Sequence, residues 1–313
     1  MNLPIQMLKK KKILTLLQKS RFVFLVLALC QNICSPGIAT AQENPDTLNH
    51  QKLKLLIIGT AVGNAATMAA LGSIWYADQP SQKFTFFNDS REWKQMDKIG
   101  HAFSSYYISD LYYKALQGVG LSSNKSNLWS ALTGFLLVSQ VEVFDGFSAG
   151  YGASWSDIGF NAAGAALAFT QHRYLDKPFI YPKYSFQRSS LASIRPSLLG
   201  KGLHEEWIKD YNGQTYWLSF DMHQAWSPFP RWLNIAVGYG AHDMIFADDL
   251  ANINAGYNPY RQYFLSIDFD FSYLKTNSSL LNTLIYFVNM IHLPAPAIEF
   301  NRVGGFQWHW LYF

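Results

Sequence analysis

The chain has 313 residues and a formal net charge of +4, with aromatic side chains at 16% and charged side chains at only 15%. Globular domains usually carry about 25% charged residues, so this imbalance indicates contact with a membrane or a large apolar interface. No stripe of basic residues is present, and we therefore expect no nucleic-acid partner.

Residues 1–41 have the layout of a signal peptide. A run of four lysines at 9–12 precedes the apolar run 22–29, and Ala39-Thr40-Ala41 supplies the small residues of a cleavage site. We therefore expect an exported protein whose mature chain begins near Gln42. A retained membrane anchor is the alternative interpretation of the same segment.

The two cysteines, Cys30 and Cys34, both lie in this signal segment. The mature chain would then have neither disulfides nor thiolate metal ligands. Lipid attachment would need one of these cysteines. Leu29 stands directly before Cys30, where a small residue would be expected, so we favour a chain without a lipid anchor.

A polar, flexible lead-in is expected at 42–54, followed by an apolar stretch at 55–77 that contains no charged side chain. Its length suits a membrane span of about 20 residues. Its many glycine, alanine and threonine residues equally suit a closely packed bundle helix. The sequence leaves both alternatives open.

Three more helices are predicted, at 97–117, 125–144 and 157–171, and Ser156 is the predicted N-cap of the last. With the stretch 55–77 they would form a four-helix bundle over residues 55–177, either embedded in a membrane or packed in water. In an up-down bundle the start of the second helix, the end of the third and the start of the fourth would meet at the same side.

Residues 178–313 are predicted to form a β-rich region, because past residue 183 the hydrophobic period changes from helical to two, which is typical of an antiparallel sheet. One helix is expected at 279–292. In the clearest strand, Ser266, Asp268 and Asp270 share one face, and apolar residues share the other. The predicted fold class is α+β, with a four-helix bundle followed by a small antiparallel sheet with one helix. The strands are expected at 216–223, 233–239, 261–271, 297–300 and 306–313.

Polar side chains occur at helical spacing where the predicted helices begin or end. Spacings of three and four residues place pairs of them on common helix faces, and the up-down arrangement brings three such ends together. The sequence therefore predicts one polar cluster. The candidate catalytic residues are His101, Glu142 and Asp157, and the candidate ligand-binding residues are Asp97, Lys98, Asp145, Ser156 and Asn161.

This cluster admits more than one chemistry. Carboxylates with one imidazole suit a divalent cation, although the residues do not identify a particular metal or cofactor. His101 paired with a carboxylate could instead act as a general base. The purely structural alternative is that Asp97 and Asp157 stabilise helix N-termini, while Glu142 pairs with Lys98.

Asp97-Lys98-x-x-His101, then Glu142, then Ser156-Asp157-x-x-x-Asn161 resembles the motif pattern of VanZ-like membrane proteins. With its leader, the chain more closely resembles the YfiM-like predicted periplasmic lipoproteins, a family without an assigned function (domain of unknown function 2279). The resemblance covers about residues 55–172. It implies an exported, membrane-associated protein in the periplasm or outer membrane of a Gram-negative bacterium.

The leading interpretation is a cell-envelope protein that is not an enzyme and whose partner is a membrane or an envelope lipid. The alternative is a hydrolase or transferase that acts on an envelope lipid or glycan through His101 with Glu142 or Asp157. The sequence does not identify protein partners.

Overall fold

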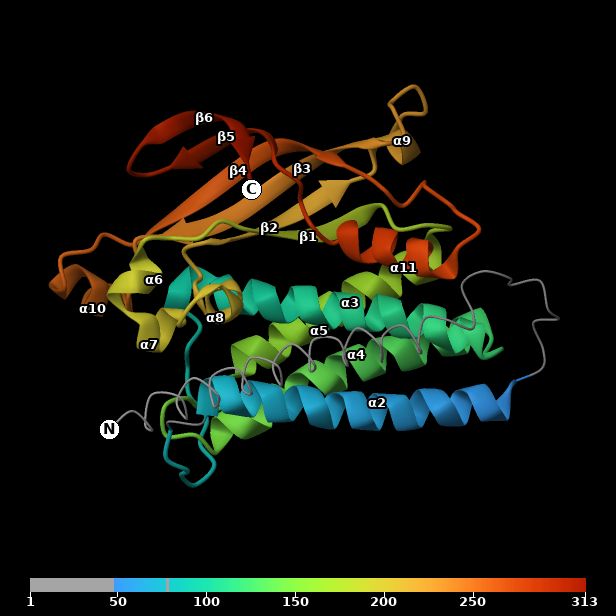
Figure 1. Ribbon diagram of the computed structural model, residues 1–313, viewed down its shortest axis with the longest axis horizontal. Helices are drawn as coiled ribbons and strands as arrows, with labels where there is room; N and C mark the ends of the chain where they lie inside the picture. The colour runs from blue at the N-terminus through green and yellow to red at the C-terminus, as the bar shows by residue number, and fades with distance from the viewer. Residues whose placement is uncertain (1–47, 77–78) are drawn as a thin grey trace, which may run out of the picture.

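The structure is a computed structural model that describes residues 48–76 and 79–313. The predicted signal peptide, with both cysteines, lies outside the described residues. The fold combines helices with one six-stranded antiparallel sheet (Figure 1).

The four long helices predicted from the sequence are all present. They are α2 (His50–Leu71), which continues as the π-helical turn η1 (Gly72–Tyr76), α3 (Met96–Gly118), α4 (Ser123–Gly146) and α5 (Trp155–Tyr174). Helices α3, α4 and α5 pack tightly against one another, whereas α2 meets them at only a few points. The predicted four-helix bundle is therefore not confirmed.

Helix α2 lies alongside this three-helix unit and leaves most of its apolar surface exposed (Figure 1). Leu56 packs against Leu116 and Val119, and Asn64 Nδ2 donates to Gln140 Oε1 at 2.8 Å. The helix and η1 together are long and apolar enough to cross a membrane, and only 6% of their most apolar 18-residue stretch is buried inside the protein. The segment is therefore an exposed apolar helix among the described residues rather than a closely packed bundle helix.

Close contact between α3 and α5 depends on Gly164, where an added Cβ would lie 2.0 Å from the carbonyl oxygen of Ala102. We expect Gly164→Ala to lower the free energy of unfolding by about 1–3 kcal/mol, because the backbone of α3 would have to move. Gly159 provides a control in the same helix, since a Cβ there meets nothing within 4 Å. Gly159→Ala should raise stability by about 0.5–1 kcal/mol. Urea denaturation measures both, and equal effects would contradict the close approach of the helices.

The sheet is larger than the small sheet that the sequence predicts. Its strand order β1-β2-β3-β4-β5-β6 follows the chain, and each neighbouring pair is antiparallel. Strand β1 was not predicted because it contains Pro182, and proline is accepted on edge strands such as this one. The strands are β1 (Ile180–Phe186), β2 (Gln214–Phe220), β3 (Leu233–His242), β4 (Tyr260–Phe269), β5 (Ala295–Asn301) and β6 (Gly305–Tyr312).

Short helices connect the strands, and only the last of them, α11 (Ser279–Val288), was predicted. None of the others is longer than seven residues, which is too short for a helical period to be visible in the sequence. They are α6 (Leu191–Ile194), α7 (Pro196–Leu199), α8 (Leu203–Lys209), α9 (Met222–Ala225) and α10 (Asp249–Asn254).

Helix α3 lies against the β1–β2 end of the sheet, while β5 and β6 lie farthest from the helices (Figure 1). The Phe103 ring is 6.2 Å from the Tyr184 ring and 5.8 Å from the Tyr216 ring. At the start of α3, the buried Met96 packs against Tyr216 and Tyr239. The sheet thus supports the end of α3 that carries the predicted cluster.

Candidate functional site

A left-handed turn fixes the direction in which α3 begins. Trp93, Lys94 and Gln95 have φ values of 47°, 51° and 66°, a conformation that costs L-residues roughly 1–2 kcal/mol each. The sheet side of the molecule holds this turn, because the Tyr239 hydroxyl donates to the Lys94 carbonyl oxygen and the Trp93 amide donates to the carbonyl oxygen of Ala247. The turn places the first residues of α3 beside the starts and ends of its neighbours.

Lys98 lies at the centre of the cluster and is fully buried. Its Nζ is 2.6 Å from Asp89 Oδ2, 2.9 Å from Asp97 Oδ2 and 2.9 Å from Asp157 Oδ1. Burial opposes the charge of this ammonium group, but Asp97 and Asp157 raise its pKa above the usual value. One cation therefore joins a loop, the start of α3 and the start of α5.

Asp89, in the loop before α3, was not predicted as a site residue. Its Oδ1 accepts hydrogen bonds from Ser154 Oγ at 2.5 Å and from Ser156 Oγ at 2.9 Å. Although burial acts in the opposite direction, the hydrogen bond from Lys98 lowers the pKa of Asp89. The Asn88-Asp89-Ser90 stretch indicates only a turn, because loop residues have no period that would place them beside a helix.

The N-cap prediction for α5 is wrong by two residues. Ser154 is the cap, with an extended backbone (φ −112°, ψ 123°) and an Oγ that accepts from the Asp157 amide at 3.1 Å. Ser156 lies in the first turn of the helix instead, and its hydroxyl contacts Ser154 Oγ at 2.8 Å. Ser156 nevertheless belongs to the cluster through Asp89.

His101 and Asn161 connect α3 to α5 next to Lys98. His101 Nδ1 lies 3.0 Å from Asn161 Oδ1, while Asn161 Nδ2 donates to Ser139 Oγ at 3.2 Å. With the amide in this orientation, Nδ1 carries the proton and Nε2 carries a lone pair. Burial lowers the pKa of His101, which favours this neutral form.

Glu142, near the end of α4, is 2% exposed and faces that lone pair. Its Oε2 accepts from the Ser154 amide at 2.8 Å. Its Oε1 has no hydrogen-bond partner among the described residues and lies 3.7 Å from His101 Nε2. Two acceptors thus face each other in a buried place, which is unfavourable unless a proton or a cation lies between them.

Asp145 lies beside the cluster rather than inside it. Its Oδ1 accepts from the Tyr76 hydroxyl at 2.6 Å, which ties the end of α4 to η1. Burial raises the pKa of Asp145 to about 6. Of the predicted residues, Asp97, Lys98, His101, Glu142, Ser156, Asp157 and Asn161 are brought together, and Asp145 contacts Tyr76 instead.

Negative charge exceeds positive charge in this cluster. Four carboxyl groups (Asp89, Asp97, Glu142 and Asp157) share the single charge of Lys98. Burial raises the pKa of Glu142 to about 8 and that of Asp157 to about 8, and it also raises the pKa of Asp97. The arrangement therefore has a capacity to take up protons or a cation near neutral pH.

Two groups of side chains in the described part of the chain could hold a metal ion, each with ligand atoms within 4.8 Å of one another. The first consists of His101, Glu142 and Asp157, and the second of Asp89, Asp97 and Asp157. Lys98 already occupies the centre of the second group. The first group is the better candidate, because two ligands of one tetrahedral ion lie roughly 3.4 Å apart, close to the observed 3.7 Å between His101 and Glu142.

Comparison with known proteins gives one match. No curated protein and no solved structure is similar to the chain. The one match is to a protein family whose description supports an exported, envelope-associated protein of unknown function. This match confirms the predicted resemblance to periplasmic lipoproteins. The VanZ-like pattern stays a prediction. Residues 85–173, which contain every side chain of the cluster, match the family described as "Predicted periplasmic lipoprotein (DUF2279)".

Proposed function

We propose that this protein is a cell-envelope protein of the periplasm or outer membrane whose α3–α5 unit binds a divalent transition-metal ion through His101, Glu142 and Asp157. The observation that carries the proposal is that His101 Nε2 and Glu142 Oε1 lie 3.7 Å apart in a buried place, and that Glu142 Oε1 has no hydrogen-bond partner among the described residues. A cation between them turns an unfavourable contact into two ligand bonds.

The mixed ligand set points to the kind of ion. An imidazole nitrogen with carboxylate oxygens suits zinc, manganese or iron, whereas calcium and magnesium prefer oxygen ligands alone. Asn161 orients the imidazole through Nδ1, and the Ser154 amide orients the Glu142 carboxylate. Such contacts are typical of the groups that support metal ligands.

The test is metal binding by the purified mature chain after treatment with EDTA. Titration calorimetry with zinc and manganese chloride should give one ion per chain, and Glu142→Gln or His101→Ala should weaken binding at least about tenfold. His204→Ala is the control, because His204 lies outside the cluster and its side chain is 63% exposed. Circular dichroism checks the fold of each variant. Absence of binding, or equal binding by Glu142→Gln, would refute the proposal.

A second candidate function is a hydrolase or transferase for an envelope lipid or glycan. It is favoured by the neutral His101, whose Nε2 makes no hydrogen bond among the described residues and so has the form of a general base. Three protein ligands would also leave an ion with open positions, as in catalytic zinc sites. If the His101→Ala protein is stably folded but the cells that carry it have an altered lipid or glycan composition in their envelope, this second function is supported over the first.

Membrane association is the remaining part of the proposal. Helix α2 supports it, because its exposed large side chains from Leu55 to Val62 are apolar and its length suits a span. The VanZ-like motif pattern extends this proposal to helices α3, α4 and α5, which would also contact lipid. Helix α2 would then be the fourth helix of a membrane-embedded bundle. The proposed partner is therefore a membrane or an envelope lipid.

A further inference from the structure

The buried side of the sheet combines an apolar cluster around Trp217 and Phe264 with several polar residues, whereas the apolar residues of the opposite side are exposed. In β4, Ser266 and Asp268 are buried, whereas Leu265 is 50% exposed and Ile267 is 39% exposed. The buried side is stabilised internally, since Lys183 Nζ pairs with Asp268 Oδ2 at 2.6 Å. This is the reverse of a sheet that faces water, so the outer face requires an apolar environment.

Strand register makes this outer face continuous across the sheet. One row of paired residues crosses five strands, and a second, aromatic row runs beside it; neither row contains a charged residue. We call these two rows the apolar sheet face. The first row consists of Leu218, Val237, Leu265, Ile298 and Trp308, and the second of Tyr263, Phe300 and Phe306.

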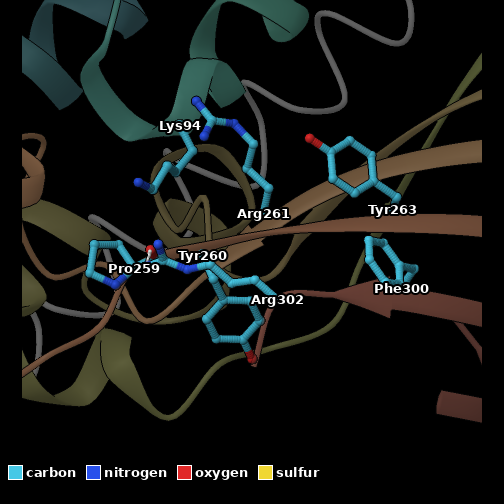
Figure 2. Close-up of a pocket in the computed structure, with 7 residues that line it drawn as sticks. All are labelled: Lys94, Pro259, Tyr260, Arg261, Tyr263, Phe300 and Arg302. Atoms are coloured by element: carbon cyan, nitrogen blue, oxygen red, sulfur yellow. Dashed lines mark hydrogen bonds between the residues drawn. The ribbon is translucent and has the colours of Figure 1, made fainter. Parts of the chain in front are cut away.

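A basic pocket adjoins the aromatic row. In Figure 2 the charged ends of Lys94, Arg261 and Arg302 lie on one side of the pocket, and Tyr263 and Phe300 lie on the other. These residues line a cavity of about 190 Å³. A space of this size holds several water molecules and is large enough for a phosphate group. The pocket and the apolar sheet face share Tyr263 and Phe300, so they form one continuous surface.

Of the three cations of this pocket, only Lys94 pairs with a carboxylate among the described residues. Lys94 pairs with Asp249. Arg261 donates to Gln95 Oε1 at 2.6 Å and to the Tyr239 hydroxyl at 3.0 Å, both uncharged groups.

Arg302 likewise donates to Asn258 Oδ1 at 2.7 Å and to the Pro259 carbonyl oxygen at 2.8 Å. Two guanidinium groups thus have no carboxylate partner in residues 48–76 and 79–313. They are held by neutral acceptors beside a cavity and are complementary to an anion.

We infer that this surface binds a phosphate-bearing membrane lipid, with the headgroup at Arg261 and Arg302 and the acyl chains along the apolar sheet face. The charge of the pocket selects an anionic group, and the neighbouring uncharged rows select hydrocarbon, so both parts of one lipid molecule are accommodated. A second copy of this chain fits less well, because the apolar sheet face offers no acidic group to the arginines. The inference rests on the envelope location in the proposed function and is independent of the cation site.

The test is co-sedimentation of the purified mature chain with vesicles, in buffer with EDTA so that the cation site does not contribute. Vesicles of phosphatidylcholine are compared with vesicles that also contain phosphatidylglycerol. The double variant Arg261→Gln/Arg302→Gln should lose roughly 20- to 30-fold in affinity for the anionic vesicles, from about 1 kcal/mol for each cation at a lipid surface. Leu265→Ser/Ile298→Ser should weaken binding to both kinds of vesicle.

The control removes the same charge elsewhere. Lys125→Gln/Arg173→Gln alters two exposed cations on α4 and α5 and should change the affinity less than about threefold. Equal binding by the Arg261→Gln/Arg302→Gln variant would refute the inference. So would inorganic phosphate that binds the pocket as tightly as the anionic vesicles do, because the ligand would then be a free anion. Loss of vesicle binding leaves the calorimetric test of the cation site unaffected, so the two proposals fail separately.

Discussion

Replacing Lys98 with methionine is expected to lower the free energy of unfolding by about 3–5 kcal/mol, the range for a buried ion pair that loses one partner. Lys98 is fully buried, and its Nζ contacts Asp89, Asp97 and Asp157 within 2.9 Å. Methionine fills a similar volume but leaves three carboxylates without a cation. Chemical denaturation of the metal-free protein at neutral pH measures the loss.

The matched control is Lys125→Met, which removes a lysine from an exposed position on α4 and should change stability by less than about 0.5 kcal/mol. A second variant tests the cause of the loss. Adding Asp157→Asn to Lys98→Met removes one of the carboxyl groups that lose Lys98 as a partner and should recover part of the stability. If Lys98→Met costs no more than the control, the aspartates are protonated in the native protein and Lys98 does not hold the three segments together.

Helical spacing is sufficient to find most of the cluster in the sequence. It places Asp97 one turn before His101 and Asp157 one turn before Asn161, and the structure brings these four residues within one site. Their role stays a prediction. Asp89 could not be found in this way, because its position depends on a loop path rather than on a period.

Alternation within a strand has a similar limit. It correctly separates Asp268 from Ile267, but it does not say which side is buried. The usual expectation would bury Ile267, whereas in this sheet the Asp268 side is enclosed because Lys183 and Ser219 supply partners for its carboxylate. Those partners come from two other strands, so only the three-dimensional arrangement identifies the enclosed face.

The metal-free protein is expected to lose thermal stability as the pH rises from about 4 to about 8. Burial raises the pKa of Glu142 from 4.5 to about 8 and that of Asp157 from 3.8 to about 8. The folded chain therefore keeps protons that the unfolded chain releases, and stability falls with rising pH between about 4 and 8. Each group contributes at most about 1.4 kcal/mol for each pH unit. Asp89 acts in the opposite sense, but its lowered pKa affects stability only at more acidic pH.

Thermal denaturation at a series of pH values, with and without zinc, distinguishes protons from a cation as the native counter-charge. Glu142→Gln should flatten the pH dependence of the metal-free protein, because glutamine cannot ionise and resembles the protonated acid. Bound zinc should flatten the wild-type curve as well, since a metal ligand is stable as a carboxylate at neutral pH. A melting temperature that rises steadily with pH in the metal-free protein would mean that Glu142 and Asp157 are already ionised and compensated. The facing acceptors of His101 and Glu142 would then need no added cation.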